Sequence, residues 1–193
     1  MALYSAKEAG RGRQVAYEPA LGEQSHRRPA IEEGLRQAIA RGKLSLHWQA
    51  KVDIGRWQMT GAEALLRWTH PTLGRVGPGE FIGVAEQCGL IDELGQWALN
   101  QACREAAAHF DGLAISVNVS PMQLRDPDFV ATVRQALRDA GLPATRLELE
   151  ITESVFMDDA DGALEQLHAL RDLGVRVALD DFGTGYSSLS YLR

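Results

Sequence analysis

Apolar residues recur along this chain with two spacings, at every second position and at every third or fourth position. The first spacing is typical of a strand with one buried face, and the second of a helix with one buried face. Alternation, or a short apolar run, predicts strands at residues 44–52, 58–68, 113–119, 147–151 and 175–179. The wider spacing predicts helices at residues 30–41, 81–85, 91–109, 127–140 and 164–173.

From residue 30 onward, strands and helices follow one another with short connections, which is typical of parallel β/α units. No glycine-rich phosphate fingerprint follows any of the predicted strands, which disfavours a dinucleotide-binding open sheet. We therefore predict an α/β fold, a TIM-like (β/α) barrel of which about five of the eight strands are present.

The first 29 residues follow a different pattern. Residues 1–17 predict a short helix that ends at Gly10 and a short strand at 14–17, with no core of their own. Residues 18–29 are polar and contain two prolines, which predicts a linker.

The composition is that of a globular protein and excludes several other classes. With 193 residues, 45% hydrophobic and 24% charged, the chain can bury one sizeable core. The net charge of −6 argues against binding to a nucleic-acid polymer, which needs a basic face. No segment has the apolar length of a membrane span or the pattern of a signal peptide. Cys88 and Cys103 both fall in helical patterns and do not imply a disulfide framework, so we expect free thiols and a cytoplasmic location.

Polar residues share one parity near the ends of the predicted strands. Side chains alternate across a strand, and in a barrel one parity faces the interior. The residues on that parity are Glu63, Arg67, Asn118, Glu150 and Asp180. The opposite parity of the last three strands is apolar, as packing against outer helices requires. Barrel enzymes hold their active sites at the carboxyl ends of the strands, so these five residues form the candidate site.

Three carboxylates and one carboxamide in this set make a group of oxygen ligands only. Such a group suits Mg²⁺ or Mn²⁺, and the absence of His and Cys from it disfavours zinc and copper. Asp181 directly follows Asp180, and two adjacent carboxylates repel each other unless a cation lies near, so Asp181 can serve a second ion. Arg67 is placed to bind a phosphate. The alternative for each residue is a solvated loop carboxylate or an ion pair inside the barrel.

Four segments in this order resemble the motifs of EAL domains, the bacterial cyclic-di-GMP phosphodiesterases. They are residues 63–67 with the signature Glu-Ala-Leu, residues 118–121, residues 150–153, and residues 180–185. Residues 2–12 resemble the tail of a GGDEF diguanylate cyclase domain, which commonly precedes an EAL domain. The resemblance assigns residues 1–17 to a GGDEF remnant, 18–29 to a linker and 30–193 to the N-terminal part of an EAL domain of the barrel type.

The resemblance also implies roles for individual residues. The implied metal ligands are Glu63, Asn118, Glu150, Asp180 and Asp181, with Mg²⁺ or Mn²⁺ as the ions. Gln49 and Arg67 would contact the substrate, a small cyclic dinucleotide, and Glu153 would steady the loop 182–189 that closes the site. The implied reaction is two-metal hydrolysis to the linear dinucleotide pGpG, by an intact protein that we expect to be a homodimer.

This chain departs from the family pattern in two places. Gln49 is followed by Ala50 where proline is common, which is a minor change. The chain also ends at Arg193, before the strand with the lysine proposed as general base, a later metal-binding glutamate and the final barrel strands. Lys43 and Lys51 do not match that lysine. We therefore expect residues 1–193 alone to be inactive.

Three alternatives remain open at this point. The domain can be a degenerate EAL receptor that binds cyclic-di-GMP without hydrolysing it, or a silent module that acts through protein–protein contacts. An unrelated metal-dependent barrel lyase is the third. Binding and turnover assays with manganese separate them.

Overall fold

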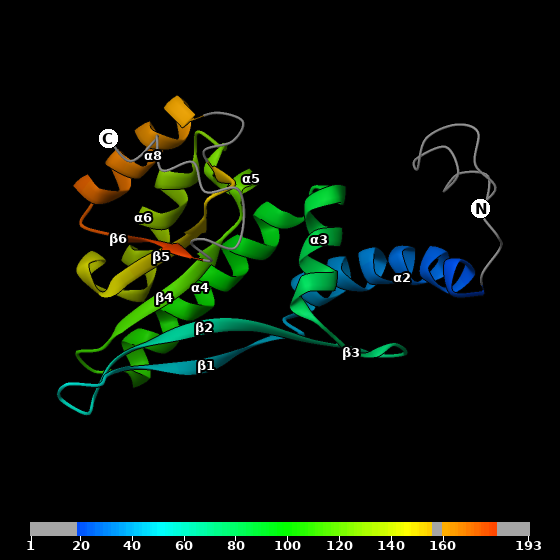
Figure 1. Cartoon of the computed structure of the whole chain (residues 1–193), viewed down its shortest axis with the longest axis horizontal. Coiled ribbons are helices and arrows are strands. Elements are labelled where there is room, and N and C mark those ends of the chain that lie inside the picture. The colour runs from blue at the N-terminus through cyan, green and yellow to red at the C-terminus, as the bar shows by residue number, and fades with distance from the viewer. Residues whose placement is uncertain (1–18, 156–159, 181–193) are drawn as a thin grey trace.

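The computed structural model describes residues 19–155 and 160–180 (Figure 1). The strands are β1 (Leu44–Asp53), β2 (Gln58–His70), β3 (Gly74–Val76), β4 (Ala114–Val119), β5 (Leu147–Thr152) and β6 (Arg176–Asp180). The helices are α2 (Pro19–Arg41), α3 (Pro78–Cys88), α4 (Ile91–His109), α5 (Pro121–Leu124), α6 (Phe129–Ala140) and α8 (Ala160–Asp172), with a 3-10 turn at Ala144–Arg146.

The strands form one mixed sheet in the order β1-β2-β4-β5-β6. β2, β4, β5 and β6 run parallel, whereas β1 and β2 form an antiparallel hairpin. The expectation of parallel units therefore fails for the first two strands, because the connection at residues 54–57 is too short for a crossover. The short strand β3, which pairs antiparallel with β2, was not predicted; three residues are too few for a clear alternation.

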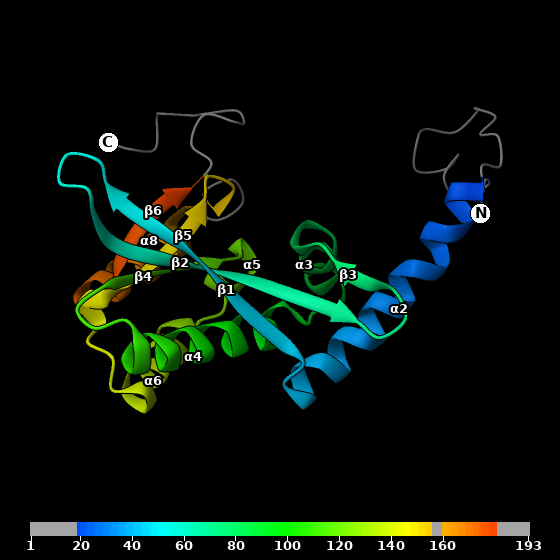
Figure 2. The same cartoon turned by 90° about the horizontal axis from the view of Figure 1, so that it is seen from below.

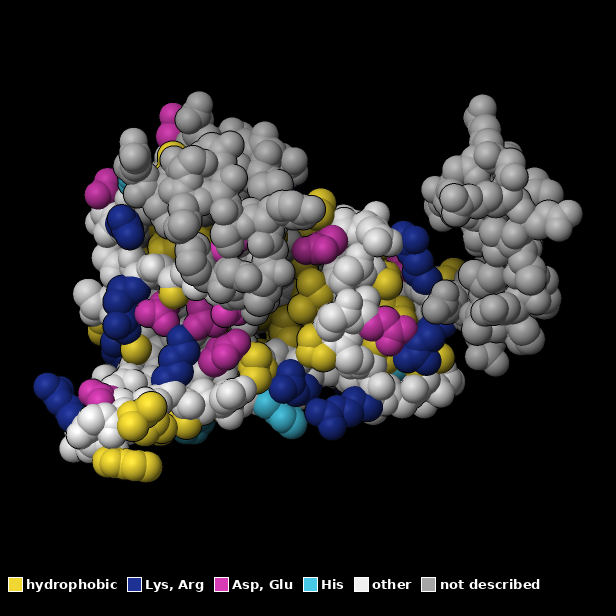
Figure 3. All heavy atoms as spheres, in the orientation of Figure 1, with side chains coloured by type: hydrophobic (Ala, Val, Ile, Leu, Met, Phe, Trp, Pro, Cys, Tyr) yellow, Lys and Arg dark blue, Asp and Glu magenta, His cyan; other side chains and the backbone are white. Residues whose placement is uncertain are grey.

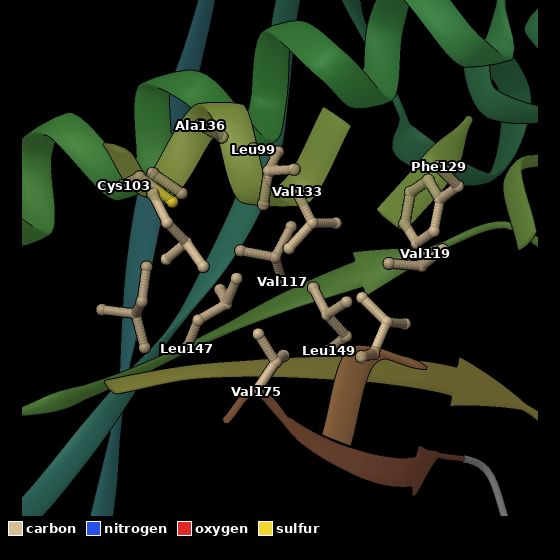
Figure 4. Packing of buried hydrophobic residues seen from close by; sticks show 14 of the residues in the cluster. Leu99, Cys103, Val117, Val119, Phe129, Val133, Ala136, Leu147, Leu149 and Val175 are labelled. Atoms are coloured by element: carbon tan, nitrogen blue, oxygen red, sulfur yellow. The ribbon is translucent and has the colours of Figure 1, made fainter. Parts of the chain in front are cut away.

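Helices α4, α6 and α8 cover one face of the sheet, as the two views at right angles show (Figures 1 and 2). Figure 4 shows Val117, Leu147 and Leu149 of the central strands packed against Leu99 of α4 and Val133 of α6. The residues of β4 and β5 on this parity are buried, which confirms that their apolar parity packs on the outer helices. The other parity is therefore left for polar side chains on the opposite face.

A second cluster of buried residues joins α2 and α3 to the far end of β2. Trp68 of β2 and Phe81 of α3 meet edge to face, with 5.9 Å between ring centroids. A Cβ atom on Gly34 of α2 would lie 2.4 Å from Cδ2 of His70, so glycine allows the helix to approach β2 closely. This cluster holds α2 on the end of the sheet.

Residues 19–29, predicted as a linker, belong to a continuous helix, and Pro29 lies inside it. Proline removes one backbone donor from a helix, but packing of the apolar face that begins at Ile31 outweighs this loss. Arg27 adds a two-bond ion pair with Glu80 of α3. The segment predicted as a linker is thus helical from Pro19 onward. Residues 1–17, predicted to end a separate domain, lie outside the described residues.

Candidate functional site

The candidate site lies near the carboxyl ends of β4, β5 and β6 and beside the middle of β2. In the registered pairs of the sheet, Glu63 lies beside Ser116, Asn118 beside Glu150, and Thr152 beside Asp180. Asn118 Nδ2 donates a hydrogen bond of 2.8 Å to Glu63 Oε1, which joins the middle of β2 to the end of β4. Figure 3 shows acidic side chains gathered over the sheet, with basic side chains beside them.

A lysine that sequence reasoning set aside lies within this cluster. Lys51 Nζ donates to Ser116 Oγ at 2.5 Å, to Glu148 Oε1 at 2.8 Å and to Glu150 Oε1. Ser116 Oγ in turn donates to Glu148 Oε1 at 2.8 Å. The sequence carries one sign of this contact, because Lys51 shares its parity on the first strand with Gln49, a residue predicted to face the site. This sign could be used only once the pairing of β1 with β2 was known.

The electrostatics of the cluster follow from burial and from these bonds. Burial raises the pKa of Glu150, and the neighbouring Glu63 raises it further, against the opposing effect of Lys51. Burial also acts to raise the pKa of Glu148, but the bonds from Lys51 and Ser116 outweigh it and hold that pKa below its usual range. The bonds to the two glutamates raise the pKa of Lys51 above its usual value, although burial acts to lower it.

Arg67 and Gln49, the residues expected to contact a substrate, lie on the polar face of the β1–β2 hairpin. Gln49 is exposed and pairs with Glu63, while Arg67 pairs with Ser45. Arg67 Nη1 donates to the carbonyl of Leu66 at 2.8 Å. Its Nε is buried without a hydrogen-bond partner within the described part of the chain. A buried N–H of this kind suits an acceptor on an anionic ligand.

The remaining predicted residues lie at the ends of β5 and β6. Asp180 is exposed at the end of β6, and Glu153 is half-buried just after β5. Asp181 and the loop 182–189 lie outside the described residues. Across residues 19–155 and 160–180, no three His, Cys, Asp or Glu side chains come together as a metal-binding group. The candidate metal ligands among the described residues offer oxygen atoms, and oxygen ligands fit Mg²⁺ or Mn²⁺.

A cleft of about 520 Å³ adjoins these residues, between α3, α4, α5 and the ends of β4 and β5. Asn118 and Glu150 contribute to its wall, as do apolar residues of α3 and α4. This volume is in the range of small-ligand sites, which are mostly apolar with a few placed polar groups. The geometry therefore provides room for a nucleotide-sized ligand beside the polar cluster.

A hydrogen-bonded turn fixes the end of β4 that carries Asn118. Ser120 caps α5 and donates to Glu86 Oε1 at 2.8 Å, and Gln123 Oε1 accepts from the backbone N–H of Ser120 at 3.1 Å. Gln123 is buried against Gly95 of α4. Sequence reasoning missed this support, because Gly95 and Gln123 are far apart in the chain.

We predict that Gly95→Ala destabilises this turn. A Cβ atom on Gly95 would lie 1.9 Å from Gln123 Nε2, so the amide has to leave its place and break its bond to Ser120. The expected cost is about 1–3 kcal/mol, the usual cost of an unsatisfied buried polar group. Hydrogen exchange of the amides at 120–124 measures it. Gly79→Ala is the matched control, since nothing lies within 4 Å of a Cβ atom there; equal effects of the two substitutions would contradict the prediction.

Comparisons with known proteins show to which family this chain is similar. The family model of the EAL domain matches residues 32–193. The chain is 42% identical over 196 residues to the bifunctional diguanylate cyclase/cyclic di-GMP phosphodiesterase MucR of Pseudomonas aeruginosa, covering all of this chain and 29% of that protein. It is also 42% identical over 197 residues to the cyclic di-GMP phosphodiesterase NbdA of the same organism, covering all of this chain and 25% of that protein. The chain thus spans about a quarter of the length of these relatives.

A solved structure supports the same placement. The MucR phosphodiesterase in complex with c-di-GMP matches with a TM-score of 0.78 and 46% identity, over 84% of this chain and 67% of that one. The likeness confirms the predicted α/β fold, a TIM-like barrel of the EAL type that is present in part. In the described residues no helix combines the length and apolar character that a membrane crossing requires. On the family match, the solved structure and the arrangement of the strands, this chain belongs to the EAL domain family.

Proposed function

We propose that the complete protein hydrolyses cyclic-di-GMP to linear pGpG with the help of Mg²⁺ or Mn²⁺. The observation that carries the proposal is the Glu63–Asn118 pair on adjacent parallel strands, with Glu150 in register beside Asn118. Asn118 and Glu150 lie near the carboxyl ends of their strands, where barrel enzymes perform their chemistry. The names of the relatives MucR and NbdA support the choice of substrate.

The proposed mechanism gives each residue a role. Glu63, Asn118, Glu150 and Asp180, together with Asp181, would hold the divalent ions. Such ions lower the pKa of a bound water and offset the charge of a phosphodiester. Arg67 and Gln49 would act on the substrate, and Glu153 on the loop 182–189.

Arg67 binds a phosphate oxygen through its buried Nε, the N–H that has no acceptor among the described residues. Gln49 contacts the ligand from the neighbouring strand, since it is exposed and pairs with Glu63. Glu153 steadies the segment that follows β6, and this role rests on the family resemblance. Substrate binding therefore depends on the β1–β2 hairpin, and ion binding on Glu63 of β2 together with the strands beside it.

The test is turnover by the complete protein after its metals have been stripped. We expect conversion of cyclic-di-GMP to pGpG with Mg²⁺ or Mn²⁺, measured by liquid chromatography, and none with excess EDTA. Ca²⁺ should block turnover, because it takes longer bonds and a looser geometry with the same oxygen ligands. Turnover that persists in EDTA would contradict the metal assignment.

One observation favours a second candidate, a receptor that binds the dinucleotide without hydrolysing it. Glu150 Oε1 is bonded to Lys51, so one proposed ligand is already engaged by a cation. A receptor of this kind would bind cyclic-di-GMP in calorimetry and give no pGpG with either metal. The same two measurements therefore separate the enzyme from the receptor.

We also propose that residues 1–17 end a GGDEF domain and that the first part of α2 joins it to the EAL domain. The bifunctional name of MucR supports the presence of both kinds of domain in one protein. The helical state of residues 19–29 makes that connection a stiff one.

A further inference from the structure

Lys51 reaches across the sheet from its edge. It lies on β1 and pairs with Gly61 of β2, yet its ammonium bonds to Ser116 on β4 and to Glu148 and Glu150 on β5. One side chain thus connects three strands through hydrogen bonds on the polar face of the sheet.

Gly61 explains how the lysine reaches so far. It carries no side chain opposite Lys51, so the polar face of β2 is open at this point. A Cβ atom on Gly61 would also lie 2.7 Å from the carbonyl oxygen of Ala114, so glycine brings β4 close to β2. Both effects shorten the path from Lys51 to β5.

The two glutamates that Lys51 binds require such a cation. Glu148 and Glu150 are two residues apart on β5 and therefore share a face. Their side chains are 22% and 9% exposed, so water screens their repulsion poorly. Lys51 lies between them and holds one oxygen of each.

We infer that Lys51 is a positioning residue for Glu150. By holding Oε1, it fixes the carboxylate so that Oε2 is the oxygen available to a divalent ion. This inference rests on the proposed function, in which Glu150 is a metal ligand. It extends the set of residues on which ion binding depends to Lys51 and Glu148.

The rival explanation is that Lys51 only balances charge, and one pair of substitutions separates the two. Lys51→Met alone removes a positive charge and leaves two carboxylates in repulsion. Lys51→Met combined with Glu148→Gln removes one charge of each sign, so the net charge of the cluster is unchanged. If Lys51 only balances charge, the double variant binds Mn²⁺ like the unaltered protein.

The measurement is calorimetric titration of the complete, metal-stripped protein with Mn²⁺ alone, beside circular dichroism to check folding. We expect the double variant to bind Mn²⁺ about ten-fold more weakly, the usual cost of losing a group that orients a metal ligand. Lys51→Arg keeps the charge but places its donors differently, and we expect a similar loss. This single variant separates the two explanations if the double variant does not fold. Lys43→Met is the control, since Lys43 is exposed and precedes β1.

Each result decides between the two explanations. A folded double variant with Mn²⁺ affinity within about two-fold of the unaltered protein overturns the positioning role and leaves the proposed function standing; Lys51→Arg with unchanged affinity does the same. An unaltered protein that binds no Mn²⁺ overturns the metal assignment itself, and this inference with it.

Discussion

Replacing Glu63 with alanine should abolish hydrolysis of cyclic-di-GMP by the complete protein. Glu63 is a proposed metal ligand, and its Oε1 also accepts the hydrogen bond from Asn118 that joins β2 to β4. The substitution removes one ligand and releases another. Loss of an outer partner of a metal site already costs about 10–100-fold in affinity or activity, so we expect a loss of at least about 100-fold.

Steady-state formation of pGpG measures this loss, with Mn²⁺ varied to show whether excess metal restores activity. Glu33→Ala is the matched control, because Glu33 is an exposed glutamate on α2, away from the ends of β4 and β5. It should leave turnover unchanged. Near-normal activity of Glu63→Ala would place the catalytic site elsewhere.

Replacing Arg146 with alanine should give the largest loss of stability among single substitutions of charged residues. Arg146 Nε donates to the carbonyl of Leu113 at 2.8 Å, and Nη2 donates to the carbonyls of Ala106 at 3.1 Å and of Phe110. These carbonyls lie at the end of α4 and at the start of β4, where a cation also meets the negative end of the helix dipole. Hydrogen bonds from a charged donor contribute about 1.5–3 kcal/mol each, and since these three share one half-buried group, we expect a total loss of about 3 kcal/mol.

Hydrogen exchange of peptides that cover residues 106–119 measures this loss locally, so it does not require the complete protein to unfold in two states. Arg134→Ala provides the comparison, because Arg134 is exposed on α6, and its effect should stay within about 0.5 kcal/mol. Equal protection in the two variants would show that Arg146 does not hold the end of α4.

Local patterns allowed much of the fold to be predicted. In β4 and β5 the alternation of apolar and polar residues separates the two faces of the sheet, because each apolar side chain there packs on α4, α6 or α8. The same alternation placed Asn118 and Glu150 on the polar face. The helix predicted from residue 127 shows the precision of such signals: the Asp126 carboxylate before it accepts the backbone N–H of Asp128, yet the α-helix begins only at Phe129.

Sequence patterns did not predict those parts of the structure that depend on residues distant in the chain. The helical state of residues 19–29 was not predicted; these residues continue a helix whose buried face begins at Ile31 and packs on α3 and β2. The hairpin of β1 and β2 was not apparent from alternation, which gives the face of a strand and not its direction.

The candidate site divides in the same way. The sequence by itself determined which residue types stand at the strand ends, and therefore that the site is rich in oxygen ligands. Only the tertiary structure decided that Lys51 bonds Glu148 and Glu150, because β1 had first to pair with β2 in one register. Arg146 likewise finds its carbonyls only once α4 and β5 lie together. The physical reason is that local order follows from spacing along the chain, whereas hydrogen bonds between distant side chains exist only after the whole sheet has assembled.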